Sequence, residues 1–297
     1  MKNRWLIWSA VGVGSLLVLF ALCVLVATAL FGDRDRLIGG AGVGVVEVKG
    51  IILDATETVR QLRVLKKDKR VKAVVLRVDS PGGVVGPSQE IAAQVKELAR
   101  EKKVVVSMGS VAASGGYYVS VPATLIYANP GTITGSIGVL MKFSNLEGLM
   151  GKVGMKAFTL KTGKFKDVGS PARSMTAEER QMLQGVIDST HGQFVRAVAE
   201  GRRLPVATVA AIADGRIFSG EQALALKLVD RIGTLQDAIE EAARLGGIKG
   251  EPELIRPPKK HIPALDLLVE GAAEHLGILS RGGGGTSIEY RMEGGGW

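Results

Sequence analysis

Two kinds of apolar pattern alternate along residues 43–245. Val43–Leu53 is rich in Val and Ile, and Val71–Val78 is nearly all apolar apart from Lys72 and Arg77, which suits a strand that is buried on both faces. Between them, apolar residues recur every third position after Thr56, which predicts an amphipathic helix capped by Thr56. The same alternation predicts strands at 104–106, 125–128 and 156–160, and helices at 89–100, from 176 onward, 206–213, 220–226 and 235–245. Repeated strand–helix units indicate a layered, mostly parallel α/β domain.

The N-terminal pattern differs from the rest of the chain. Residues 5–32 contain no charged side chain, and Lys2 and Arg4 precede them. This run is longer than the roughly 20 residues that span a bilayer and longer than the ~7–15 apolar residues of a signal peptide. It predicts a transmembrane anchor that leaves the following chain on the extracytoplasmic side. Ala27-Thr28-Ala29 also fits a cleavage site, so cleavage of the anchor after Ala29 stays open.

These patterns suggest four parts. Residues 1–32 form the cytoplasmic N-terminus and anchor, 33–42 a linker, 43–250 the α/β domain and 251–297 a C-terminal extension of unassigned role. The extension contains an amphipathic stretch at 265–279 and ends in a Gly-rich tail. The single cysteine, Cys23, lies inside the anchor, so the exported part has no disulfide.

Composition narrows the function classes. Of the 297 residues, 46% are hydrophobic, which is enough to build a large core, and the formal net charge is +9. Aromatic residues make up 5% of the chain and no nucleic-acid motif is present, so we expect no nucleic-acid partner. The basic residues are spread along the chain, which favours a solvated surface or attraction to anionic lipids. No spacing typical of a metal site occurs, and we expect no metal.

The segment that points most directly to chemistry is Met108–Ser120. The apolar run at 104–106 leads into small residues around Ser114, and a helix-compatible run follows. A strand that feeds a tight turn and a helix would expose the Ser114 hydroxyl next to free backbone N–H groups. This setting suits a nucleophilic serine, although a Gly/Ser-rich loop with a helix-capping serine has the same pattern.

A nucleophilic serine needs a base. His191 falls in the middle of a predicted helix, and His261 and His275 lie in the weakly patterned C-terminal region, so no histidine is well placed. Lysine remains, but a lysine accepts a proton only when burial has lowered its pKa by several units.

Four segments together resemble the signal peptide peptidase A family. They are Asp79–Gly83, Met108–Ser120, Thr134–Val139 and Gly163–Pro171, and the resemblance covers residues 43–245 in order and with closely matching spacing. Members of the short form are membrane-anchored bacterial Ser-Lys peptidases. The resemblance implies the layered βα superhelix of Clp proteases and crotonases.

The resemblance also implies roles for individual residues. Ser114 is expected to be the nucleophile and Lys166 the general base. Ser136 matches the hydroxyl that orients the lysine, and the N–H groups of Gly83 and Gly115 are expected to form the oxyanion hole.

Two other lysines compete with Lys166 for the role of base. Lys161 and Lys164 lie close by, but Asp167 and the Gly-Ser-Pro that begins at Gly169 fix the family register on Lys166.

We therefore expect an endopeptidase without cofactors that degrades residual signal peptides and other short hydrophobic peptides at the outer face of the cytoplasmic membrane. Family members assemble into rings or domes, so a homo-oligomer is expected. Three alternatives stay open. These are a related membrane-bound Ser-Lys protease with one specific partner, an inactive oligomeric scaffold that binds peptides, and an acyl-CoA enzyme, which an exported compartment disfavours.

Overall fold

The computed structural model describes the chain except for residues 1–17, 20–21, 23–39, 259–288 and 292–297. Most of the predicted anchor and all of the predicted helix at 265–279 therefore lie outside the described residues. Within the described ranges, no helix combines the length and apolarity that a bilayer crossing requires. The sheet and the helices around it lie within the second of the chain's two units, residues 42–297.

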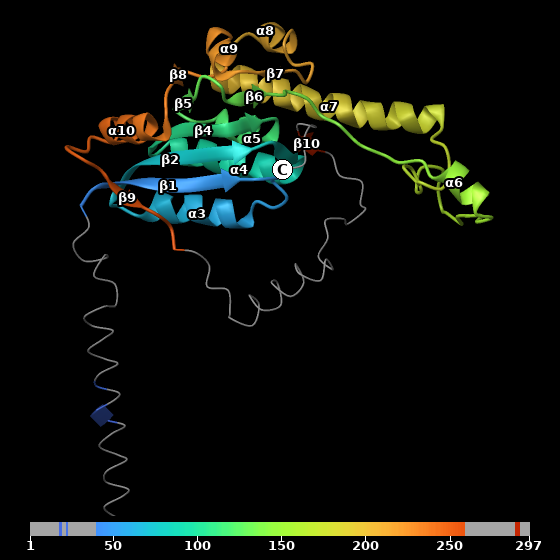
Figure 1. Ribbon diagram of the computed structural model, residues 1–297, viewed down its shortest axis with the longest axis horizontal. Helices are drawn as coiled ribbons and strands as arrows, with labels where there is room; N and C mark the ends of the chain where they lie inside the picture. The colour runs from blue at the N-terminus through green and yellow to red at the C-terminus, as the bar shows by residue number, and fades with distance from the viewer. Residues whose placement is uncertain (1–17, 20–21, 23–39, 259–288, 292–297) are drawn as a thin grey trace, which may run out of the picture. The chain divides into compact units, whose positions relative to one another are not determined.

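The fold is built on a mainly parallel sheet with the order β7-β6-β4-β2-β1-β9, and β5 and β8 extend it beside β4 (Figure 1). Only β7 runs antiparallel to its neighbour in this sheet. Its strands are β1 (Gly42–Lys49), β2 (Val71–Ser80), β4 (Lys103–Ala113), β5 (Leu125–Ala128), β6 (Ile133–Gly135), β7 (Ile217–Phe218), β8 (Arg231–Ile232) and β9 (Glu253–Ile255). The predicted parallel α/β domain is confirmed.

Helices cover both faces of this sheet. Helices α3 and α4 lie on one face and α10 on the other, where it contacts β1, β2 and β4 (Figure 1). The described helices are α3 (Thr56–Lys67), α4 (Val85–Ala99), α5 (Gly115–Ser120), α6 (Glu147–Lys152), α7 (Ala177–Arg202), α8 (Val206–Ala210), α9 (Gly220–Ala225) and α10 (Leu235–Leu245).

The apolar run from Ala73 to Leu76 in strand β2 is explained by burial on both faces of the sheet. Val74, Leu76 and Val78 enter the core beneath α3 and α4, whereas Ala73 and Val75 enter the smaller core beneath α10. All five side chains are fully buried, so the predicted two-faced burial is confirmed.

Several boundaries differ from the prediction. Helix α4 begins at Val85 rather than Gln89, because Pro87 is tolerated in a first turn whose N–H groups lack helical partners. Thr56 is the first residue of α3 and not its cap, since its N–H donates to Asp54 Oδ1 at 2.8 Å. Helix α7 begins as predicted, with Thr176 closing a capping box.

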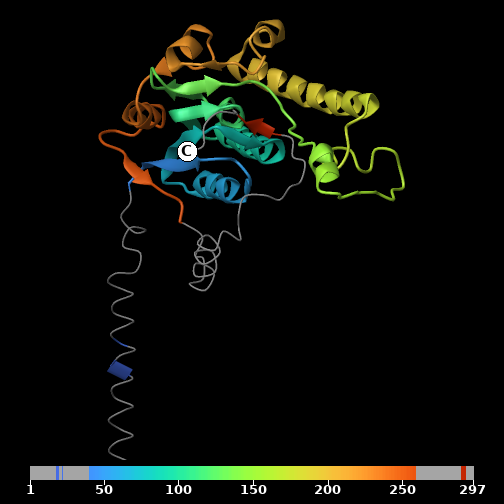
Figure 2. The ribbon, with the colours of Figure 1, turned by 45° about the vertical axis from the view of Figure 1, so that its right-hand side comes forward.

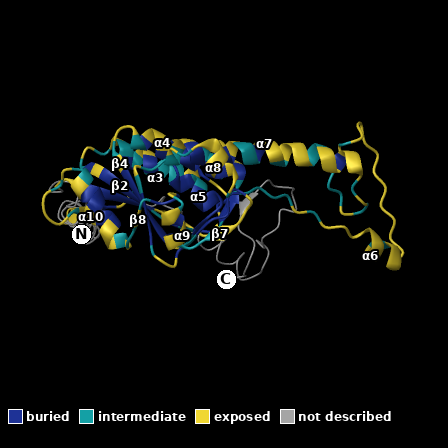
Figure 3. Ribbon diagram, turned by 90° about the horizontal axis from the view of Figure 1, so that it is seen from above, coloured by how far each residue is buried: buried dark blue, intermediate teal, exposed yellow. Residues whose placement is uncertain are grey.

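The strand predicted at 156–160 is wrong. These residues lie in the arm, which we define as residues 140–175, between β6 and α7. The arm projects from the sheet and carries α6 away from α5 (Figures 1 and 2). Figure 3 shows it mostly exposed beside the buried strands. Its exposed apolar side chains are Leu146, Leu149, Val153, Met155, Phe158 and Leu160.

Strand β3 (Gly82–Val84) forms a separate two-stranded sheet with β10 (Glu289–Arg291). The two run antiparallel, and Tyr290 stands opposite Gly83. A segment of the C-terminal extension thus returns to the end of β2 (Figure 1).

Candidate active site

Ser114 stands at the junction of β4 and α5, as predicted. Its φ of 53° and ψ of −114° lie in a region that residues with a side chain rarely adopt. The residue is 1% exposed, and its Oγ has no hydrogen-bond partner among the described residues. Buried hydroxyls without a partner are uncommon, and strained backbone collects at functional sites. Both features favour a nucleophile over a helix-capping serine.

Backbone contacts hold this turn in place. Ser114 N donates to Gly135 O at 2.8 Å, and Tyr118 N donates to Ser114 O at 2.8 Å. Gly116 is required for the close approach of α5 to β2, because a Cβ at this position would lie 2.6 Å from Ser80 O.

Helix α5 is itself anchored by its two tyrosines. Tyr117 is fully buried and its hydroxyl donates to Leu228 O at 2.8 Å. Burial raises the pKa of Tyr117 well above its usual range, so the phenol stays a neutral donor. Tyr118 packs edge-on against Phe194 of α7 with ring centres 5.0 Å apart. The Ser114 turn therefore rests on a rigid support.

The two glycines predicted to form the oxyanion hole belong to elements in contact with each other, β3 and α5. Gly115 is the first residue of α5, so its N–H has no partner within the helix. Gly83 admits no side chain, because a Cβ there would lie 2.1 Å from Ile52 O.

Strand β3 has one side already paired within the domain. Ile52 N donates to Gly82 O, and Val84 N donates to Ile52 O. The other side of β3 pairs with β10. An extended backbone can therefore be accepted antiparallel along Gly83.

Ser136 directly follows Gly135, the residue that accepts the N–H of Ser114. It is 6% exposed, has a φ of 50°, and its N–H donates to Arg216 O at 2.8 Å. The structure thus places Ser136 next to the Ser114 turn.

Lys166 is not brought to Ser114 within one chain. It lies in the arm, its side chain is exposed, and its N–H closes a turn on Gly163 O at 3.1 Å. Because Ser114 Oγ has no partner in the described part of the chain, Lys166 Nζ does not bond to it. The predicted roles of Ser114, Ser136, Gly83, Gly115 and Lys166 all remain predictions.

The two lysines that compete with Lys166 each form an ion pair. Lys161 Nζ lies 2.5 Å from Asp167 Oδ1, and Lys164 pairs with Glu178. Among the ion pairs found in the described ranges, none includes Lys166.

The residue that the motif comparison overlooked is Arg173. Its guanidinium lies between the carboxylates of Asp167 and Glu179. The sequence feature that could have identified Arg173 is its position between the Gly163–Pro171 motif and the capping box at Thr176.

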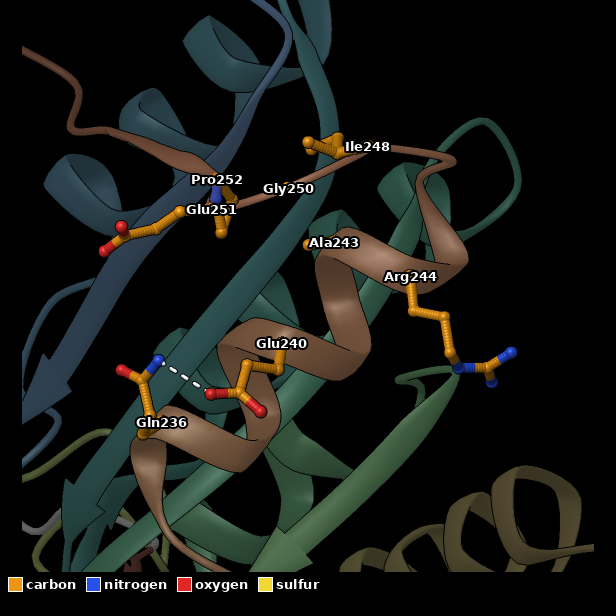
Figure 4. Close-up of a pocket in the computed structure, with 8 residues that line it drawn as sticks. All are labelled: Gln236, Glu240, Ala243, Arg244, Ile248, Gly250, Glu251 and Pro252. Carbon is orange, nitrogen blue, oxygen red and sulfur yellow. Dashed lines mark hydrogen bonds between the residues drawn. The ribbon is translucent and has the colours of Figure 1, made fainter.

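Other features do not add to the site. His191 lies in α7, and its buried Nε2 has no partner among the described residues. A pocket lies between α10 and residues 248–252, where Gln236 donates to Glu240 at 2.9 Å (Figure 4). It is lined by none of the predicted site residues. Over the described ranges, no cluster of three or more metal-ligating side chains occurs.

Two protein-family models and several proteases match this chain. Residues 96–249 match the model of peptidase family S49, and residues 49–126 match the Clp protease model. A candidate protease of Synechocystis sp. is 45% identical over 78% of this chain and 87% of its own length. A candidate signal peptide peptidase SppA of Enterococcus faecium is 39% identical over 66% and 61%, and Protease 4 of Salmonella typhi is 37% identical over 71% and 35%.

Proposed function

We propose that this chain, which belongs to peptidase family S49 and is a serine peptidase of the signal peptide peptidase A type, uses Ser114 as its nucleophile and Lys166 as its base. The observation that carries the proposal is the buried Oγ of Ser114, which lies on a strained turn and has no hydrogen-bond partner among the residues that the structure describes. The S49 match spans Ser114, Ser136 and Lys166.

The proposed roles imply the following reaction. Lys166 Nζ takes the proton as Ser114 Oγ attacks the carbonyl carbon of the scissile bond. The oxyanion that forms accepts hydrogen bonds from the N–H groups of Gly83 and Gly115. Lys166 then returns the proton to the amine as the C–N bond breaks, which leaves an acyl ester on Ser114. Water, deprotonated by the same lysine, attacks the ester carbonyl, and Ser114 Oγ leaves as the ester C–O bond breaks and takes the proton back from Lys166.

The exposed arm supports a homo-oligomer. Within the described part of the chain, Ser114 Oγ has no hydrogen-bond partner, and Lys166 lies on an arm whose apolar side chains face solvent. Exposed apolar patches of this kind mark interaction surfaces. We infer that the arm packs against a second copy and that Lys166 serves the Ser114 of that copy.

Strand β3 supports a peptide substrate bound as an added strand. Its second side takes β10 antiparallel at Gly83, the same backbone that would hold the oxyanion. Strand addition recognises the peptide mainly through its backbone and less through its side chains. This suits an enzyme that degrades peptides of varied sequence.

The substrate class and location rest on the sequence. Residues 5–32 are an uncharged run preceded by basic residues, which supports anchoring with the catalytic domain on the extracytoplasmic side of the cytoplasmic membrane. An enzyme held there would meet cleaved signal peptides and other short hydrophobic peptides.

The test is cleavage of a signal-peptide library by the full-length protein in detergent, with Ser114→Ala as the control. We expect cleavage that is absent from the variant. Equal cleavage by both proteins, or none by either, would overturn the proposal.

In membranes washed with salt and carbonate, retention of the full-length protein supports the anchor and release would refute it.

A further inference from the structure

The loop that carries Lys166 contains no helix or strand that would fix it. From Gly163 to Ser170, backbone contacts are successive turns, including Val168 N to Phe165 O and Ser170 N to Asp167 O, both at 3.1 Å. A base must be held to within a fraction of an ångström to be effective. Some other contact must restrain this loop.

Arg173 supplies that restraint on the residue next to Lys166. Its Nε donates to Asp167 Oδ2 at 3.0 Å, and its Nη2 donates to Asp167 Oδ1 at 2.8 Å. Nη2 also lies 3.3 Å from the main-chain oxygen of Asp167. The guanidinium fork therefore holds both the side chain and the backbone of Asp167, which a single-point charge cannot do.

The same guanidinium is fastened to α7. Its Nη1 donates to Glu179 Oε2 at 3.0 Å, and Nη2 donates to Glu179 Oε1. Glu179 is 3% exposed, and its Oε2 accepts the N–H of Thr176 at 2.9 Å in the capping box. Asp167 is thus tied through Arg173 to a buried carboxylate on a long helix.

We propose that Arg173 is a positioning residue that fixes Lys166 for catalysis by clamping Asp167 to Glu179. This inference rests on the proposed function, because it assumes that Lys166 is the base. It adds a specific requirement: the loop must be held by a planar, two-sided donor. A neighbouring exposed pair, Lys164 with Glu178, also links this loop to α7 but lacks that geometry.

The experiment compares kcat and KM for peptide cleavage in the full-length protein. We expect Arg173→Gln to lower kcat at least ~10-fold, with KM within about two-fold of the wild type, because peptide binding at β3 does not involve the clamp. The kcat of Arg173→Lys should lie between those of the wild type and Arg173→Gln, because lysine keeps the positive charge but not the forked geometry of the guanidinium. Glu178→Gln, which breaks only the exposed pair, should match the wild type.

Chemical rescue separates positioning from folding. Adding guanidinium ion at non-denaturing concentration should restore part of the kcat of Arg173→Ala, whereas sodium ion should not. If Arg173→Gln does not fold stably, the kcat of Asp167→Asn and the guanidinium rescue of Arg173→Ala test the proposal instead. Asp167→Asn should also lower kcat, because it removes the charge that the fork grips.

The failures are distinguishable. If Lys166→Ala keeps its activity, the proposed function fails, whatever Arg173 does. If Lys166→Ala is inactive while Arg173→Gln keeps the wild-type kcat, or if guanidinium rescues nothing, the clamp is refuted and the proposed function stands.

Discussion

The main-chain N–H of Ser114 donates to the main-chain oxygen of Gly135 at 2.8 Å. This bond places Ser136, the next residue, beside the turn that presents the candidate nucleophile. Both serines have positive φ angles, 53° and 50°. Two adjacent strained turns at the ends of β4 and β6 form the centre of the site.

The first prediction concerns Ser136. If its hydroxyl orients the base, Ser136→Ala should lower kcat at least ~10-fold with little change in KM, because the lost contact acts mainly in the transition state. If it only satisfies the turn, the variant should melt at a lower temperature while the folded fraction keeps its rate. Rate against pH and melting temperature are measured on the same preparations. An unchanged rate at every pH would remove Ser136 from the mechanism.

The second prediction concerns which chain supplies Lys166. Ser114→Ala and Lys166→Ala should each be inactive alone. If each site takes one residue from each of two copies, as proposed, mixed oligomers should recover about a quarter of the wild-type activity. The subunits are mixed under conditions that exchange them, and cleavage is then measured. Oligomers shown to be mixed but still inactive would mean that both residues act within one chain.

Much of this site follows from the sequence. The apolar run into Ser114 and the small residues after it predict the strand, the turn and α5, because a close approach to β2 admits only glycine at Gly116. The motif comparison also selects Ser136, which the structure places beside that turn.

What the sequence could not predict depends on long-range partners. Phe158 and Leu160 lie in a strand-like run, yet they are 89% and 95% exposed because residues 156–160 pair with no strand in the described part of the chain. The pairing of β10 with β3 joins segments far apart in the sequence, and a three-residue strand leaves no readable periodicity.

The third prediction concerns β10. Because this strand occupies the side of β3 proposed to bind peptides, the chain's own segment should compete with substrate at high effective concentration. Removing residues 259–297 should lower KM for short peptides several-fold without changing kcat. Removing only residues 293–297, which keeps β10, is the matched control. Equal KM values for both truncations and the full chain would contradict this prediction.

The fourth prediction concerns acid stability of the clamp. Hydrogen bonds from Arg173 and then from the N–H of Thr176 lower the pKa of Glu179 to about 2. Hydrogen bonds from Arg173 and then Lys161 hold the pKa of Asp167 well below its usual range. Carboxyls with a lowered pKa stabilise the fold above their unfolded pKa, and this contribution is lost as the pH falls through the folded value.

Glu179→Gln keeps the cap but loses the charge. Its melting temperature should therefore lie below that of the wild type near neutral pH, and the gap should close between about pH 4.5 and pH 2. Glu178→Gln is the control for a neighbouring exposed carboxyl. A gap that is independent of pH would show that the ionised Glu179 carboxylate contributes nothing.

Whether Ser114 is the nucleophile and Lys166 its base is tested most directly by covalent labelling of the full-length protein with a fluorophosphonate, followed by mass mapping of the modified residue. We expect one adduct on Ser114, none in Ser114→Ala, and labelling slowed at least ~10²-fold in Lys166→Ala but near the wild-type rate in Lys164→Ala. An adduct on another residue, or loss of labelling in Lys164→Ala with Lys166→Ala unaffected, would contradict it.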